Sequence, residues 1–201
     1  MTQLSSKVTP VYPTEPVFPL TVEQYHTMIE TGVLTDDDPV ELIEGVLVFH
    51  MPKNPPHTYV LEAVTETLRP LLPSGWTLRA QEPVTLDDGE PEPDVVIARG
   101  NRRRYRQRHP GPADVGIVIE VSDSTLDRDR GTKLRSYARA GIAEYWIVNV
   151  AEQVIEVRTE PLSDGTEPSY RHTRFISAPK TMSLILGGET VAEISVRDFF
   201  D

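Results

Sequence analysis

The run Gly-Ile-Val-Ile-Glu-Val at residues 116–121 constrains the fold more than any other feature of this sequence. Apolar and β-branched residues occupy successive positions of the run, so a strand built from it must be covered on both faces. Strands of this kind lie inside sheets that are packed between helices. The run therefore predicts an α/β core, and it places one carboxylate, that of Glu120, inside that core.

The other elements are predicted from hydrophobic periodicity and from residues that begin or end helices. Helical spacing indicates helices over 22–31, 57–72 and 128–140, with Asp127 and Asp129 serving the start of the last one. Alternating or continuous apolar runs bounded by turn residues indicate strands at 40–43, 46–49, 77–86, 95–98, 145–150, 154–158, 170–175 and 182–186. A closing tail is expected at 198–201.

Length and composition favour a single domain. A chain of 201 residues with 38% hydrophobic and 25% charged residues can bury one core, so residues 20–201 are expected to form one domain. Residues 1–19 are rich in proline and are expected to form an extended arm. We find no run of about 18 apolar residues and no basic start followed by an apolar segment, so we expect a cytoplasmic protein without a membrane span.

Charge and cysteine content limit the partners. The chain has no cysteine, so a metal ion must be held by oxygen or imidazole, which favours Mg²⁺ or Mn²⁺ over structural zinc. A net charge of −11 argues against binding nucleic acid through bulk electrostatics. One stretch differs because it contains five arginines and no acid: Arg102, Arg103, Arg104, Arg106 and Arg108. This stretch is either a local contact for phosphates or a solvated loop.

Three charged residues lie where they can form a catalytic site. Asp94 and Glu120 lie at the ends of apolar strands, and Lys133 lies near the start of the helix that follows. Buried carboxylates need a partner, and a shared metal ion is one. The two carboxylates, the carbonyl of Val121 and water would complete the shell of Mg²⁺ or Mn²⁺, which activates a water to attack phosphorus, and Lys133 would orient that water or stabilise the developing charge. Alternatively, Asp94 is a turn residue, Glu120 pairs with an arginine and Lys133 is solvated.

A set of short motifs, taken in order along the chain, resembles the Uma2 family. This family is a restriction-endonuclease-like group within the PD-(D/E)XK superfamily, and the resemblance covers residues 20–200. The motifs are Glu41-Leu-Ile-Glu-Gly45, His57 at a helix start, Pro93-Asp94-Val, Ile119-Glu120-Val-Ser122, Asp129 with Lys133 and Tyr137, and Gly141 with Glu144-Tyr-Trp-Ile147.

The resemblance implies a mixed sheet flanked by helices, that is, a restriction endonuclease-like PD-(D/E)XK core. It matches Asp94 to the Asp of the PD element and Glu120 to the Glu of the E-x-K element. Ser122 stands where the superfamily pattern has lysine, so Lys133 on the next helix is the expected replacement.

The resemblance also implies further residues near the site. His57 is expected there because the superfamily supplies another ligand from the helix before the PD strand, although a helix-start residue bonded to backbone is the alternative. Glu41 and Glu44 are the other candidates for an outer ligand. Ser122 and Tyr137 are candidates for substrate contact, with helix capping and core packing as the respective alternatives.

The first hypothesis from these observations is that the protein is a metal-dependent endonuclease that hydrolyses DNA phosphodiester bonds. A non-catalytic nuclease-fold module that binds DNA or a protein partner is the second. A metal hydrolase of small phosphoesters is the third. The net negative charge of the chain is more compatible with a small substrate than with long DNA. Exposed strands and the hydrophobic tail at 194–200 further suggest a homodimer.

Overall fold

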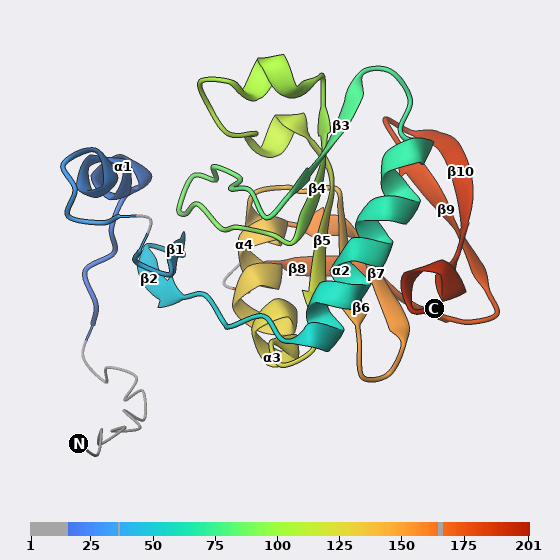
Figure 1. The fold of residues 1–201 in the computed structure, drawn as a ribbon. Helices are drawn as coiled ribbons and strands as arrows, with labels where there is room; N and C mark the ends of the chain where they lie inside the picture. The colour runs from blue at the N-terminus through green and yellow to red at the C-terminus, as the bar shows by residue number, and fades with distance from the viewer. Residues whose placement is uncertain (1–15, 36, 165–166) are drawn as a thin grey trace.

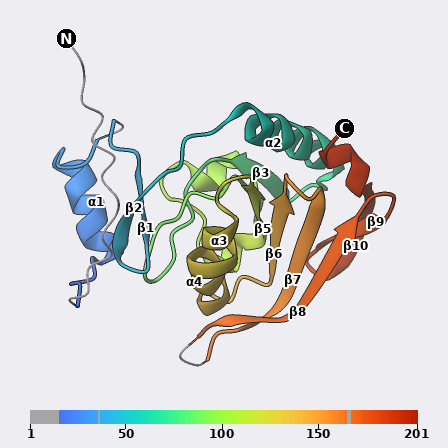
Figure 2. The same cartoon turned by 90° about the horizontal axis from the view of Figure 1, so that it is seen from below.

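The computed structural model describes residues 16–35, 37–164 and 167–201. Most of the expected proline-rich arm lies outside these residues, and residues 16–20 have no regular structure. Figure 1 shows the fold, and Figure 2 shows it from below. None of the helices in the described ranges is both long enough and apolar enough to cross a membrane.

A six-stranded sheet forms the centre, in the order β3-β4-β5-β6-β7-β8. The strands β5 and β6 are parallel, and every other neighbouring pair is antiparallel, so the sheet is mixed as expected. The strand bounds are β3 (Trp76–Ala80), β4 (Val95–Arg99), β5 (Val115–Ser122), β6 (Glu144–Asn149), β7 (Val154–Leu162) and β8 (Ser169–Ser177).

Two layers cover the sheet, one on each face (Figures 1 and 2). One layer contains α2 (Pro55–Leu68) with η1 (Arg69–Leu71), the hairpin β9 (Thr181–Leu186) and β10 (Glu189–Ser195), and η5 (Val196–Phe199). The other contains a helical segment made of α3 (Leu126–Arg128), the π-helical η4 (Asp129–Lys133) and α4 (Leu134–Arg139). The remaining elements are α1 (Val22–Glu30), the hairpin β1 (Val40–Ile43) and β2 (Val46–Phe49), η2 (Arg102–Tyr105) and η3 (Pro112–Asp114).

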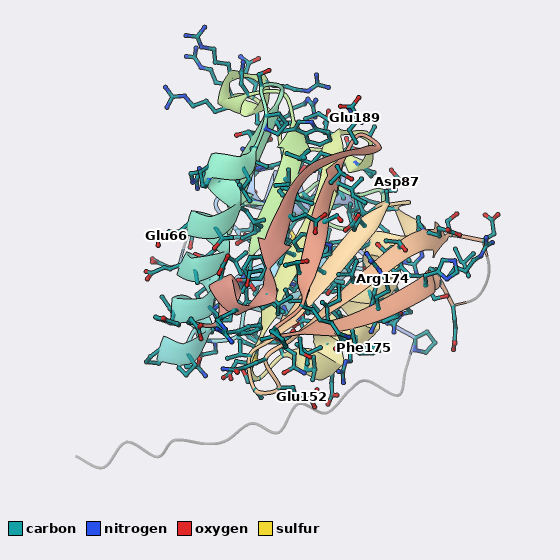
Figure 3. The ribbon with its side chains drawn as sticks, turned by 90° about the vertical axis from the view of Figure 1, so that its right-hand side faces the viewer. Glu66, Asp87, Glu152, Arg174, Phe175 and Glu189 are labelled. Atoms are coloured by element: carbon teal, nitrogen blue, oxygen red, sulfur yellow. The ribbon has the colours of Figure 1, made fainter. Side chains whose placement is uncertain are left out.

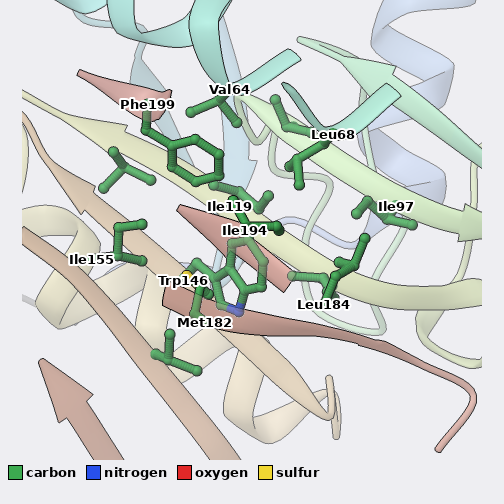
Figure 4. Packing of buried hydrophobic residues seen from close by; sticks show 14 of the residues in the cluster. Val64, Leu68, Ile97, Ile119, Trp146, Ile155, Met182, Leu184, Ile194 and Phe199 are labelled. Carbon is green, nitrogen blue, oxygen red and sulfur yellow. The ribbon is translucent and has the colours of Figure 1, made fainter. Parts of the chain in front are cut away.

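The larger core lies between the sheet and α2 (Figure 4). Val64 and Leu68 of α2 pack there with Ile119 and Trp146 of the sheet, and all four are fully buried. Each side chain of this size contributes about 1.5–3 kcal/mol on burial. Charged residues such as Glu66 lie on the outer face of α2, as Figure 3 shows.

The hydrophobic tail belongs to this same core. Ile194, Val196 and Phe199 are at most 1% exposed and pack within the chain itself. The tail therefore gives no support to the expected homodimer, which stays a prediction.

Two predicted elements differ from the structure. The strand expected over 77–86 ends at Ala80, because Gln81 adopts a left-handed backbone with φ of 56° and Pro83 has no N–H to donate. The helix expected over 128–140 begins at Leu126 and contains a π turn at Asp129–Lys133, both of whose end residues are buried. The sequence pattern does not predict the strand β10.

Candidate active site

The register of the sheet places Asp94 and Glu120 side by side. Val95 of β4 pairs with Ile119 of antiparallel β5, so the next pair outward is Asp94 opposite Glu120 on one face. Directly opposed residues have Cβ atoms about 4.5–5.5 Å apart, and like charges in such a pair destabilise the sheet. The two carboxylates therefore require compensating groups nearby.

Lys133 and Tyr137 provide hydrogen bonds to Glu120. The Lys133 Nζ donates to Glu120 Oε1 at 2.8 Å, and the Tyr137 hydroxyl donates to the same oxygen at 2.7 Å. Burial raises the pKa of Glu120 to about 8, with Asp129 and Asp94 adding to the rise and Lys133 opposing it. Burial would lower the pKa of Lys133, but the surrounding carboxylates outweigh it and raise that pKa above its usual value. Lys133 is thus a permanent cation inside an acidic site.

Asp94 is held differently. Its Oδ2 lies 3.2 Å from His57 Nε2 and accepts a hydrogen bond from the Val121 N–H at 2.8 Å. Burial alone would raise the pKa of Asp94, but the contacts with His57 and Val121 lower it below its usual value. His57 reaches this position from the first turn of α2, which begins after the capping residue Asn54.

Two more carboxylates complete the cluster. Glu41 is 1% exposed, pairs with Arg128, and has its Oε2 3.7 Å from Lys133 Nζ. Asp129 is 2% exposed and accepts hydrogen bonds from the hydroxyls of Ser122 and Thr125. The cluster therefore holds three buried carboxylates and the partly buried Asp94 around Lys133 and Arg128.

These groups line a cavity of about 70 Å³ that also touches the segment 50–54 and residues 123–125. A volume of this size accommodates a cation and a few water molecules but not a nucleotide. Any larger substrate must therefore approach the cavity from its mouth.

The donor set suits a hard cation that keeps part of its water shell. Within the described ranges, no group of three or more His, Asp or Glu side chains is arranged to hold a metal ion alone. Two carboxylates are available, and the Val121 carbonyl points to the same side of β5 as its N–H, which faces Asp94. Mg²⁺ and Mn²⁺ accept such a set, because they bind oxygen and retain water. Burial, and then the charges of Asp129 and Asp94, raise the pKa of Glu120, and such an ion would favour its ionised form.

Other candidate residues from the sequence lie elsewhere. Glu44 pairs with Arg135 and Arg139 outside the cavity. Tyr137 is fully buried behind Glu120, so its ring cannot touch a substrate in this structure. Ser122 is 1% exposed and bonds to Asp129 instead of reaching the cavity mouth.

The arginine stretch follows the far end of β4. Arg102, Arg103 and Arg104 belong to η2, which comes after Arg99, whereas Asp94 precedes the start of the strand. Neither these three residues nor Arg106 and Arg108 line the cavity. The stretch does not extend the candidate site, because β4 separates the two.

The sequence pattern does not predict several of the cavity residues. Asn54 donates to the Asp123 carboxylate and so ties the segment before α2 to the loop after β5, and Arg128 also donates to the Phe49 carbonyl. The pattern places Asp129 at a helix start, yet this residue faces the cavity. The one available signal is the unusual density of acids and hydroxyls at residues 122–129.

The fold and the site together define a class. A mixed sheet with helices on both faces, two carboxylates at the ends of adjacent strands and a lysine from the next helix describes a restriction endonuclease-like fold. The family model for Uma2, described as "Putative restriction endonuclease", matches residues 22–194. The chain belongs to the Uma2 family.

A solved structure supports the same fold. It is described as that of "a putative nuclease belonging to DUF820 from Anabaena variabilis ATCC 29413". The similarity covers 90% of this chain and 98% of the other, with a TM-score of 0.62 and 15% sequence identity. No curated protein matches the chain.

Proposed function

We propose that this protein is a divalent-metal-dependent nuclease that hydrolyses phosphodiester bonds in DNA, with Asp94 and Glu120 as metal ligands. The observation that carries the proposal is the pairing of these two carboxylates across β4 and β5, with Lys133 bonded to Glu120. Membership of a family described as "Putative restriction endonuclease" and a fold shared with a protein described as "a putative nuclease" support it.

Each residue has a role that follows from its contacts. Asp94 and Glu120, with the Val121 carbonyl, would hold Mg²⁺ or Mn²⁺, which supplies an activated water and neutralises charge on the phosphate. Lys133, held charged by its carboxylate neighbours, would stabilise negative charge that develops on the phosphate. His57 fixes the orientation of Asp94, and Tyr137 fixes that of Glu120.

One observation favours a second candidate, a hydrolase of small phosphoesters. The chain carries a net charge of −11, and the cavity itself is acidic, so extended duplex DNA gains little from general electrostatic attraction. A small ester would need only the metal and Lys133.

The test is cleavage by the purified protein in Mg²⁺ and in Mn²⁺. The substrates are supercoiled plasmid, linear duplex, a single-stranded oligonucleotide and a nitrophenyl ester of a mononucleotide. The nuclease proposal requires nicking or linearisation of plasmid that disappears with EDTA. Hydrolysis of the small ester alone would favour the second candidate, and no hydrolysis of any substrate would favour a non-catalytic module that binds DNA or a protein.

A further inference from the structure

Gln81 lies in the same cross-strand row as the two proposed metal ligands. Ala80 of β3 pairs with Val95, which pairs with Ile119, so the next row contains Gln81, Asp94 and Glu120. The Gln81 N–H donates to the Asp94 carbonyl at 2.9 Å, which continues the ladder by one residue beyond β3. Neighbouring strands lie about 4.8 Å apart, so Gln81 is the next residue along the row from Asp94.

The backbone and side chain of Gln81 are both unusual. Its φ of 56° is in the left-handed region, which a residue other than glycine adopts at a cost of about 1 kcal/mol. Its side chain lines the cavity, and the buried Nε2 has no hydrogen-bond partner among the described residues. A strained backbone together with an unsatisfied buried donor at the edge of a cavity is a reason to look for a ligand there.

Some of the buried polar atoms that lack a partner belong to residues of this cavity. In the described part of the chain, eight buried side-chain nitrogen or oxygen atoms lack a partner, and three of them belong to cavity residues: His57, Gln81 and Arg128. His57 and Arg128 each have another nitrogen bonded to a carboxylate. The Nε2 of Gln81 is therefore a neutral donor without an acceptor in the described ranges, on a side chain that lines the cavity.

We propose that Gln81 is a substrate-positioning residue: its side-chain amide turns when substrate binds, so that Nε2, which is buried in the free protein, donates to a non-bridging oxygen of the phosphodiester at the cavity mouth. This inference rests on the proposed nuclease function. A neutral donor suits this place, because it can bind a phosphate oxygen without competing with the metal ion for the carboxylates. Positioning of this kind contributes to rate because a small displacement of the phosphate from the attacking water is costly.

The variants are Gln81→Gly and Gln81→Glu, with Gln153→Gly and Gln153→Glu as matched controls. Gln153 also has a left-handed backbone, with φ of 51°, but is exposed in the turn between β6 and β7 and does not line the cavity. Glycine removes the amide and tolerates the left-handed backbone, so Gln81→Gly should fold with an unchanged or raised thermal midpoint.

Three measurements decide the matter: the thermal midpoint, the Kd for Mn²⁺ by isothermal titration calorimetry, and kcat and KM for DNA cleavage. We expect Gln81→Gly to lower kcat/KM about tenfold and Gln81→Glu about a hundredfold, because a carboxylate repels the phosphate. The Kd of Gln81→Gly for Mn²⁺ should stay within about twofold of the parent, since a phosphate contact is no metal ligand.

Two results would overturn the inference while leaving the nuclease proposal intact. One is cleavage by Gln81→Gly equal to that by Gln153→Gly. The other is a tenfold weaker Mn²⁺ affinity of Gln81→Gly, which would make Gln81 a metal ligand. Failure of the parent protein to cleave DNA or bind Mn²⁺ would instead reject the proposed function, and this inference with it.

Discussion

The strand pair β4 and β5 carries buried acid at both of its ends, and the two ends balance that charge differently. Asp114, just before β5, is 6% exposed and pairs with Arg104 and Arg108 at 2.6 Å each. The hydrogen bond from Arg108 is the main reason that the pKa of Asp114 falls to about 2. At the other end, burial among Asp129 and Asp94 raises the pKa of Glu120 to about 8.

The difference separates a structural ion pair from a site with unmet charge. Two arginines around one carboxylate leave no need for another cation. At the cavity end the carboxylates of Glu41, Asp94, Glu120 and Asp129 outnumber Lys133 and Arg128, so a proton on Glu120 or a further cation must offset the remaining negative charge. The same strands therefore present a closed cluster at one end and a candidate metal centre at the other.

The largest expected effect is the loss of DNA cleavage when a carboxylate at the cavity end is neutralised. Asp94→Asn and Glu120→Gln should each lower kcat by at least about 10³-fold, because a metal ligand contributes several kcal/mol of transition-state stabilisation. Plasmid nicking in Mn²⁺ measures this. Asp114→Asn at the other end is the control and should keep parental kcat; equal losses at both ends would remove the distinction between them.

The next effect concerns stability at the cavity end. Lys133→Met should lower the free energy of unfolding by about 3–5 kcal/mol, because it leaves Glu120 buried without its cation, whereas Glu41 keeps Arg128. Lys180→Met, at an exposed lysine before β9, should change it by less than about 0.5 kcal/mol.

Urea unfolding of both lysine variants provides the comparison. Adding Glu120→Gln to Lys133→Met should recover part of the loss, since it removes one of the uncompensated charges. An unaltered unfolding free energy in Lys133→Met would mean that the carboxylates are already neutral without the lysine.

A smaller effect is expected at the closed cluster. Asp114→Asn should lower the free energy of unfolding by about 1–2 kcal/mol at pH 7. This is less than the energy equivalent of the whole pKa shift, because Arg104 and Arg108 are half exposed and solvent screens the pair. The folded state lowers this pKa from 3.8 to about 2, so the stabilisation is present above pH 4 and is lost as the pH falls towards 2. Urea unfolding measures the difference in unfolding free energy between the parent and Asp114→Asn, and this difference at pH 3 should be about half of its value at pH 7. A difference that is larger at pH 3 would contradict the ion-pair account.

The smallest effect is expected from the exposed arginines beyond β4. Replacing Arg102, Arg103 and Arg106 with glutamine should leave kcat unchanged, because none of them lines the cavity. It should weaken the binding of duplex DNA only a few-fold. The plot of log K against log salt concentration should become shallower by about 0.9 for each phosphate contact that is lost. Fluorescence anisotropy of a labelled duplex at several salt concentrations measures both, and a large fall in kcat would place these residues in the site after all.

Local pattern predicted what depends on neighbours in sequence. The helix expected at 57–72 is found at Pro55–Leu68 with a 3₁₀ extension, and the buried strand expected at 116–121 is found at Val115–Ser122. Asp94 and Glu120 could be selected because a carboxylate at the end of an apolar strand is visible in sequence alone. Lys133 could be selected because it lies near the start of the helix that follows the strand of Glu120, and the resemblance added that position 122 lacks a lysine.

Pairing across the sheet could not be predicted, because register depends on residues far apart in the chain. That Asp94 lies opposite Glu120, and Gln81 beside Asp94, follows only from the ladder. Asp129 and Lys133 stand at the two ends of a π turn, and both lie on the buried side of this segment. No periodicity in the sequence signals an inserted π turn.

The most direct test of the central claim is calorimetric titration of Mn²⁺ into the parent protein, Asp94→Asn and Asp114→Asn. If the cavity end of β4 and β5 holds the cation, the parent and Asp114→Asn bind one Mn²⁺ with the same affinity, and Asp94→Asn binds it at least about tenfold more weakly. If Asp94→Asn binds Mn²⁺ as the parent does, or if the parent binds none, the cavity is not a metal centre and the proposed nuclease mechanism is wrong.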